Sequence, residues 1–165
     1  MNGVLEFITG EHKRTLDDRY RLSIPAEMCD VLMNAPGGES TRCMLTKERV
    51  GCLGLWNADA WESKLAADVE LVKSKMAAGK FHDQVGQVQL LGRLLSTRDT
   101  AVNLSGRGRL SIPESFRPFL GVEPNEEVMV VGAGVSIEIW KPSAWLDYVE
   151  QQMPEFRTLL SELSG

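Results

Sequence analysis

The sequence lacks several features that would mark common classes of protein. Its 165 residues contain no run of about eighteen apolar residues, which a membrane-spanning helix requires. The first residues lack the basic and apolar regions of a secretory signal peptide. Cysteine occurs only three times, and we interpret this odd number as reduced thiols. These absences predict a cytoplasmic protein with no membrane partner.

The sequence is also poor in the residues that catalysis requires. His12 and His82 are the only histidines and lie in unrelated contexts, so a histidine-based triad or a metal cluster has almost no raw material. Ser23 and Ser111 are not in a Gly-x-Ser-x-Gly motif, and the 132–134 Gly-Ala-Gly segment joins two predicted strands. We therefore expect no enzyme activity, no cofactor, no metal and no small-molecule substrate.

A basic excess is missing as well. The 18 Lys and Arg residues are outnumbered by 23 Asp and Glu residues, which gives a formal net charge of −5. Binding to phosphate groups needs Lys and Arg. The balance therefore argues against a nucleic-acid partner unless the basic residues are concentrated in one place.

What the sequence does contain is an internal duplication. The pentapeptide Arg-Leu-Ser-Ile-Pro occurs at residues 21–25 and again, unchanged, at 109–113, an offset of 88 residues. Each half also has two tryptophans five residues apart, which are Trp56 and Trp61, then Trp140 and Trp145. The tryptophans are offset by 84 residues, so the first half contains a short insertion. The turn-forming stretch 34–41 is its natural position.

Both halves predict the same order of elements. Within the pentapeptide, Leu and Ile alternate with Arg and Ser, which is the pattern of a strand with one buried face. The proline ends that strand and can open a short helix, and a β-hairpin and a second helix follow. The short helices are expected at 26–32 and 114–120, the hairpins at 42–56 and 127–140, and the second helices at 60–77 and 143–152.

The repeats define the expected domain organisation. We predict a first repeat at 5–60, a two-helix connector at 61–96, a second repeat at 97–152 and an amphipathic C-terminal tail at 153–165. One repeat is too small to sustain its own core. We therefore predict an α+β fold in which the two hairpin/helix repeats interlock into one closed β-barrel, which removes exposed sheet edges.

The doubled motif Leu-x4-Arg-Leu-x-Ile-Pro, followed by a hairpin ending in Trp and by a second Trp, resembles the MraZ family of the SpoVT–AbrB swapped-hairpin superfamily over about residues 5–152. The resemblance implies a bacterial transcriptional regulator, cytoplasmic and nucleoid-associated. Such a protein binds short direct repeats in double-stranded DNA upstream of the division and cell-wall operon. The resemblance also implies one swapped-hairpin barrel per chain and a homo-oligomeric ring.

Two positions depart from the usual Asp-x-x-Gly-Arg turn of this family. The first copy has Tyr20 where glycine is expected, and the second has Ser105 where aspartate is expected. If the turn needs a positive φ at residue 20, a side chain there costs about 1–2 kcal/mol, or the turn adopts another type.

Arginines gather at the two repeat-related turns. Arg21 and Arg109 should face outward, because they alternate with buried leucines, and a guanidinium there can bridge phosphate oxygens or pair with guanine. Alternatively, an arginine can pair with the nearby aspartate and only fix the turn. For Lys13 and Arg14 a solvated strand edge is the favoured alternative. The expected DNA-binding residues are Arg19, Arg21, Arg107, Arg109, Lys13 and Arg14.

Two functions therefore compete. The first is a sequence-specific DNA-binding regulator that uses paired turns. The second is an oligomeric protein-interaction module that has lost DNA binding, and Tyr20, Ser105 and the net charge of −5 favour it. The tryptophans occupy equivalent places at a strand end and a helix start, so we assign them to packing and not to base stacking.

Overall fold

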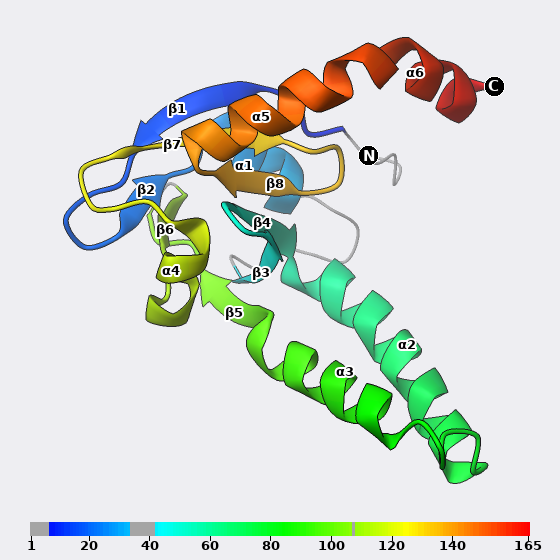
Figure 1. The fold of residues 1–165 in the computed structure, drawn as a ribbon. Coiled ribbons are helices and arrows are strands. Elements are labelled where there is room, and N and C mark those ends of the chain that lie inside the picture. The colour runs from blue at the N-terminus through cyan, green and yellow to red at the C-terminus, as the bar shows by residue number, and fades with distance from the viewer. Residues whose placement is uncertain (1–6, 34–41, 107) are drawn as a thin grey trace.

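The computed structural model describes residues 7–33, 42–106 and 108–165 (Figure 1). It is an α+β fold with a six-stranded antiparallel sheet and a separate two-stranded ladder. The strands are β1 (Glu11–Thr15), β2 (Arg21–Ser23), β3 (Arg42–Arg49), β4 (Cys52–Asn57), β5 (Asp99–Asn103), β6 (Arg109–Ser111), β7 (Glu127–Gly132) and β8 (Ile137–Trp140). The helices are α1 (Ala26–Met33), α2 (Ala58–Ala77), α3 (Val85–Thr97), α4 (Arg117–Leu120), α5 (Pro142–Gln152) and α6 (Phe156–Ser164), with 3₁₀ turns η1 (Glu114–Phe116) and η2 (Met153–Glu155).

The two halves interlock through strand pairing. In the duplication β1 corresponds to β5, β3 to β7 and β4 to β8, and the sheet order is β1-β7-β8-β4-β3-β5. Each half therefore adds its first strand to the hairpin of the other half, and the two hairpins meet where β4 pairs with β8. No ladder among the described residues joins β1 to β5, so closure into a barrel stays a prediction.

The two copies of the pentapeptide pair with each other as β2 and β6. Next to this ladder, the Ile24 N–H donates to the Gly108 carbonyl and the Ile112 N–H donates to the Tyr20 carbonyl, both at 2.8 Å. The two bonds are related by the 88-residue offset of the duplication, so a pseudo-two-fold axis passes between the strands. In the register, Arg21 lies opposite Ser111, Leu22 opposite Leu110, and Ser23 opposite Arg109.

One apolar cluster fills the space enclosed by the sheet, the ladder, α1 and α4. Alternating residues of the central strands, such as Leu53 of β4 and Ile139 of β8, are fully buried in it. On the opposite face of the sheet Trp140 packs against Cys52 and Val131 and is covered by α5. The ring centroids of Trp140 and Trp145 are 5.3 Å apart, and those of the equivalent pair Trp56 and Trp61 are 4.9 Å apart. The four tryptophans therefore pack, as predicted.

Two helical segments extend away from this core (Figure 1). The Asn57 side chain caps α2 by accepting a hydrogen bond from the Ala60 N–H at 3.1 Å. The chain then reverses and returns along α3, which forms a helical hairpin, while α6 extends beyond α5 at the C-terminus. None of the helices in the described part of the chain is long and apolar enough to cross a membrane.

The turns before β2 and β6 both have a positive φ at the residue just before the strand, with different residues there. Tyr20 and Gly108 are equivalent, and both have positive φ, at 58° and 94°. The Arg117 guanidinium lies 4.1 Å from the centre of the Tyr20 ring. At Gly108, a Cβ atom would lie 2.7 Å from the Cys29 sulfur and 3.2 Å from the Ile24 carbonyl oxygen. The first turn therefore has room for a side chain, and the second has none.

A half-buried carboxylate lies on the outer face of the sheet. Glu138 of β8 lies opposite Gly54 of β4, and its Oε1 accepts a hydrogen bond from Trp140 Nε1 at 3.0 Å. Burial raises the pKa of Glu138, and the nearby Glu48 carboxylate raises it further. Ionisation of Glu138 is therefore less favourable in the folded protein than in the unfolded chain.

We predict that Gly108→Ala destabilises the fold by about 2 kcal/mol or more. A left-handed backbone costs a residue with a side chain roughly 1–2 kcal/mol, and the new Cβ overlaps the Cys29 sulfur. Thermal unfolding of Gly108→Ala, Cys29→Ala and the double variant measures the effect. Because Cys29→Ala removes the overlapping atom, the double variant should be more stable than the sum of the single losses. Strictly additive losses would contradict the steric explanation.

We predict that Glu138→Gln raises the melting temperature at pH 8 and that this gain shrinks toward pH 4. The pKa of Glu138 is higher in the folded than in the unfolded protein, so its cost appears as the pH rises above the unfolded value. Glutamine keeps an oxygen that can accept the Trp140 hydrogen bond. Glu127→Gln, at an exposed position of β7, is the control. A gain at Glu138 that does not change with pH would contradict the prediction.

Candidate nucleic-acid interface

The β2–β6 ladder separates polar from apolar side chains. Leu22 and Leu110 are buried in the core, so the residues on either side of each leucine lie on the opposite face. Three of these are exposed, and Arg21 is half-buried. We call this surface the ladder face, and it consists of Arg21, Ser23, Arg109 and Ser111.

Asp17 organises the first turn. Its Oδ1 accepts hydrogen bonds from the Arg19 and Arg21 backbone N–H groups, both at 2.8 Å, and its Oδ2 accepts one from Arg21 Nε at 2.9 Å. These bonds, led by the one from the Arg21 backbone, lower the pKa of Asp17. Within the described residues nothing pairs with the two Nη groups of Arg21. The aspartate thus fixes the arginine and leaves the end of its guanidinium available.

The second turn lacks this anchor. Ser105 and Arg109 exchange two backbone hydrogen bonds, at 3.0 and 2.9 Å, and Gly106 and Gly108 supply positive φ angles. The exposed Arg109 side chain has no hydrogen-bond or ion-pair partner in the described part of the chain. Arg107, also a candidate, lies outside the described residues. The two equivalent arginines therefore differ, because Arg21 is held and Arg109 is free to meet an anion.

The remaining candidates lie beside the ladder and not on it. Arg19 is exposed in the first turn, two residues before β2. Lys13 and Arg14 lie on β1, which is an edge strand of the sheet, and Arg14 Nη1 donates to the Lys13 carbonyl at 2.8 Å. Because side chains alternate along a strand, Lys13 and Arg14 point to opposite faces of the sheet edge. Lys13 and Arg14 therefore belong to the six-stranded sheet, whereas Arg21 and Arg109 belong to the separate two-stranded ladder.

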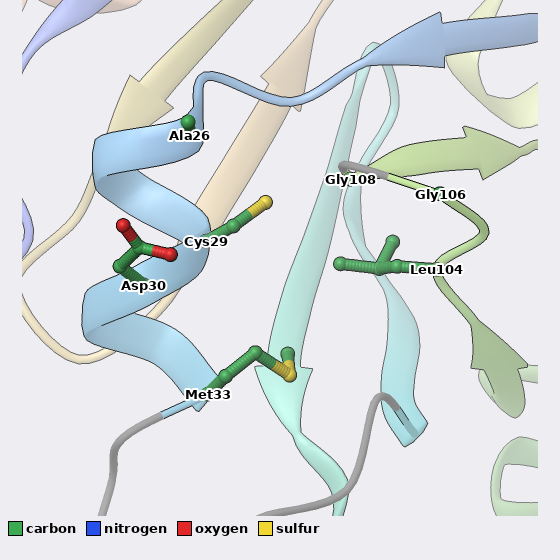
Figure 2. A pocket seen from close by; sticks show the side chains of 7 residues that line it. All are labelled: Ala26, Cys29, Asp30, Met33, Leu104, Gly106 and Gly108. Carbon is green, nitrogen blue, oxygen red and sulfur yellow. The ribbon is translucent and has the colours of Figure 1, made fainter.

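Two recesses open at the second turn. The smaller, of about 220 Å³, is lined by Ser23, Ser105, Gly106 and Arg109, and it places hydroxyls and a guanidinium together. The larger, of about 270 Å³, shares Gly106 with it and lies against α1. Figure 2 shows Cys29 and Met33 projecting from α1 toward Leu104 across this recess. Sequence reasoning did not foresee the smaller recess, although the turn position of Ser105 in the repeat was a signal for it.

The recesses offer hydrogen-bond donors and a protonated thiol. Burial raises the pKa of the Cys29 thiol to about 11, so the thiol stays protonated at neutral pH and is a poor nucleophile. No group of three His, Cys, Asp or Glu side chains in the described ranges is arranged to hold a metal ion. The ladder face instead offers guanidinium and hydroxyl donors, which suit phosphate oxygens and guanine edges.

Comparisons with known proteins agree with the motif. Residues 95–162 match the family model described as "MraZ protein, putative antitoxin-like". Proteins named transcriptional regulator MraZ from Treponema denticola and Nitrosospira multiformis are 27% and 28% identical, over 90% and 92% of this chain and 92% of each relative. The one from Methylobacillus flagellatus is 33% identical over 94% of this chain and 96% of its own length. With that identity over nearly the whole of both proteins, the chain belongs to the MraZ family.

Proposed function

We propose that the protein is a transcriptional regulator that binds double-stranded DNA in a sequence-specific way through the ladder face. The observation that carries the proposal is the exposed Arg109 side chain, which has no described partner, on a two-stranded ladder beside donor hydroxyls. Relatives across nearly the full length are named transcriptional regulators, which supports the proposal and gives no support to an enzyme. Like such regulators, the protein would work in the cytoplasm, associated with the nucleoid.

A two-stranded ribbon fits the major groove of B-DNA, which is about 12 Å wide. Arg109 would then pair with guanine O6 and N7 or bridge phosphate oxygens, and Arg21 would do so in the orientation that Asp17 fixes. Arg19, Arg107, Lys13 and Arg14 would contact phosphates and set the register. Each proposed role uses only donor groups, which matches the acceptor-rich surface of DNA.

The two ends of the ladder are related by the pseudo-two-fold axis but carry different turns. Asp17 and Tyr20 stand at one end, and Ser105 and Gly108 at the other. One chain would therefore read an asymmetric DNA sequence, which supports short direct repeats and not palindromes as the target. In this proposal the DNA-binding part of the chain consists of the repeats at 5–60 and 97–152. A connector at 61–96 joins them, and a tail at 153–165 follows. The interlocked pairing supports a swapped-hairpin barrel as its platform.

The acidic total predicts weak DNA binding by one chain. Net charge is −5, so few phosphates can be neutralised outside the ladder face and its neighbours. Several chains in one homo-oligomeric ring would present several ladder faces, and linked weak contacts gain affinity through effective concentration. Binding should therefore depend on assembly and fall steeply with salt.

The competing function is an oligomeric interaction module that has lost DNA binding. The net charge and the two turn substitutions, Tyr20 for glycine and Ser105 for aspartate, favour it. The two functions differ in one measurement, the preference of the wild-type protein for its own upstream region over random duplex at moderate salt. A clear preference supports the regulator, and equal binding or none supports the module.

Arg109→Ala should weaken binding to that upstream duplex about tenfold, because a bidentate guanine contact is worth about 1–3 kcal/mol. The slope of log affinity against log salt should also become shallower by about one unit if the lost contact is to phosphate. Fluorescence anisotropy across a salt series measures both. Lys75→Ala removes one exposed positive charge from α2 and should change neither quantity. Equal effects of the two substitutions would argue against the ladder face.

Asp17→Ala should weaken DNA binding several-fold, although it removes a negative charge. The loss follows because three hydrogen bonds that hold the first turn and Arg21 disappear. Asp18→Ala removes the same charge from the neighbouring exposed position and should leave binding unchanged or slightly tighter. Opposite effects at the two positions support the role of Asp17 in positioning Arg21. Tighter binding by both variants would show that only net charge matters.

A further inference from the structure

A further cation lies beside the first turn of the ladder and outside the ladder face. Arg117 of α4 stacks on Tyr20, with the centre of its guanidinium 4.1 Å from the centre of the ring. Arg117 Nε donates to the Ile112 carbonyl at 3.0 Å, and the Ile112 N–H donates to the Tyr20 carbonyl at 2.8 Å. The three residues therefore form a closed set of contacts that holds the guanidinium at the Arg21 end of the ladder.

The outer edge of the Arg117 guanidinium is available for binding. Its Nε group is used by the Ile112 carbonyl, but neither Nη group has a hydrogen-bond or ion-pair partner within the described residues. The side chain is only half-buried. Two free N–H groups on one guanidinium edge suit the oxygens of a phosphate. The ring of Tyr20 fixes the guanidinium plane in advance, which reduces the side-chain freedom lost on binding.

The duplication places a neutral pair at the equivalent position of the second turn. Cys29 and Gly108 correspond to Arg117 and Tyr20 by the same 88-residue offset. The Cys29 thiol donates to the Ile24 carbonyl at 3.9 Å, and the Ile24 N–H donates to the Gly108 carbonyl at 2.8 Å. Both turns therefore contain the same set of contacts, but only in the first does this set include a positive charge.

The two pairs cannot be exchanged one residue at a time. A Cβ atom at Gly108 would lie 2.7 Å from the Cys29 sulfur, so the second turn has no space for a tyrosine. Figure 2 shows the Cys29 side chain between α1 and Gly108. Without a ring at residue 108, an arginine at residue 29 would have no aromatic face to stack on. The ring and the cation thus occur together at the first turn, and both are missing from the second.

The charges of the two turns show why a further cation matters at the first. Residues 17–21 contain two aspartates and two arginines, so their charges sum to zero. The equivalent residues 105–109 contain two arginines and no acid. A turn without net positive charge gains little from facing phosphate groups. Arg117 gives the first-turn end of the ladder the net positive charge that residues 17–21 lack.

We propose that Arg117 is a further DNA-binding residue, which contacts a backbone phosphate at the first-turn end of the ladder while it is stacked on Tyr20. The inference rests on the proposed function and deepens it, because it adds a contact from outside the two repeat turns. Tyr20, which replaces the expected glycine, is then part of the binding surface. A phosphate contact fixes position and affinity and carries no base preference.

The substitution Arg117→Gln tests the contact. Glutamine removes the positive charge and keeps a side-chain N–H that can donate to the Ile112 carbonyl. Binding to the upstream duplex and to a random duplex should weaken by the same factor, about fivefold at about 0.1 M salt. The slope of log affinity against log salt should become shallower by about one unit on both duplexes. Fluorescence anisotropy across a salt series measures both quantities.

Two further variants separate a phosphate contact from a structural role. Arg117→Lys keeps the charge and should keep the wild-type slope, with a smaller loss of affinity than Arg117→Gln. Arg157→Ala removes an exposed arginine from α6 and should change neither quantity. A wild-type slope for Arg117→Gln would overturn the proposal even if affinity falls. Equally shallow slopes for the lysine and glutamine variants would also overturn it, because the lost charge would then not be the cause.

Tyr20→Gly tests the stack without changing any charge. Glycine adopts the positive φ of residue 20 without steric cost, so the turn should still form. Loss of the ring leaves the Arg117 guanidinium without its platform, and DNA binding should weaken several-fold with the salt slope retained. Circular dichroism measures the melting temperature of the same variant. Unchanged or tighter DNA binding by Tyr20→Gly would overturn the proposal.

The two duplexes distinguish failure of this inference from failure of the proposed function. If the wild type prefers its upstream region and Arg109→Ala weakens binding, but Arg117→Gln keeps the wild-type slope, the Arg117 contact alone is overturned. If the wild type binds both duplexes equally and Arg117→Gln still flattens the slope, sequence-specific regulation is overturned and the contact stands. A wild type that binds neither duplex overturns both.

Discussion

The pairing of the duplicated pentapeptide with its own copy is the constraint on which the rest of the structure depends. The β2–β6 ladder and the two hydrogen bonds beside it, from Ile24 to Gly108 and from Ile112 to Tyr20, tie the halves together across the pseudo-two-fold axis. Leu22 and Leu110 then point into the core, and the arginines of the same strands must point out. One pairing therefore both closes the core and creates the ladder face.

The two turns occupy equivalent positions in the duplication, so the differences between them can be compared residue by residue. Both turns need a residue with positive φ. In the first turn this residue is Tyr20, whose ring contacts the Arg117 guanidinium, and in the second it is Gly108, which lies close to Cys29. Only the first turn has an aspartate that holds its arginine. The fold thus presents two equivalent arginines in different states, one anchored and one free, and in the proposed function the two would contact adjacent DNA segments differently.

Much of the fold could be predicted from the sequence because the duplication fixes equivalent elements and alternation fixes their buried sides. The α+β class, the helix that ends at Ala77 and the packing of the tryptophans followed from those patterns. Other features depend on distant partners. The space beside Tyr20 is set by Arg117, and the burial of Glu138 is set by strands from both halves. Local sequence patterns do not show which distant residues become neighbours in the fold. The space beside Tyr20 and the partial burial of Glu138 could therefore not be predicted.

The acidic composition limits the DNA affinity that one chain can reach in the proposed function. A chain with net charge −5 and one small basic ladder face cannot hold DNA tightly alone, since each neutralised phosphate adds only a limited gain. In the proposed function, assembly into an oligomer would supply the missing affinity, because several ladder faces would then bind together. None of the acids belongs to the ladder face, so the surface proposed to meet DNA carries only positive charge although the whole chain is acidic.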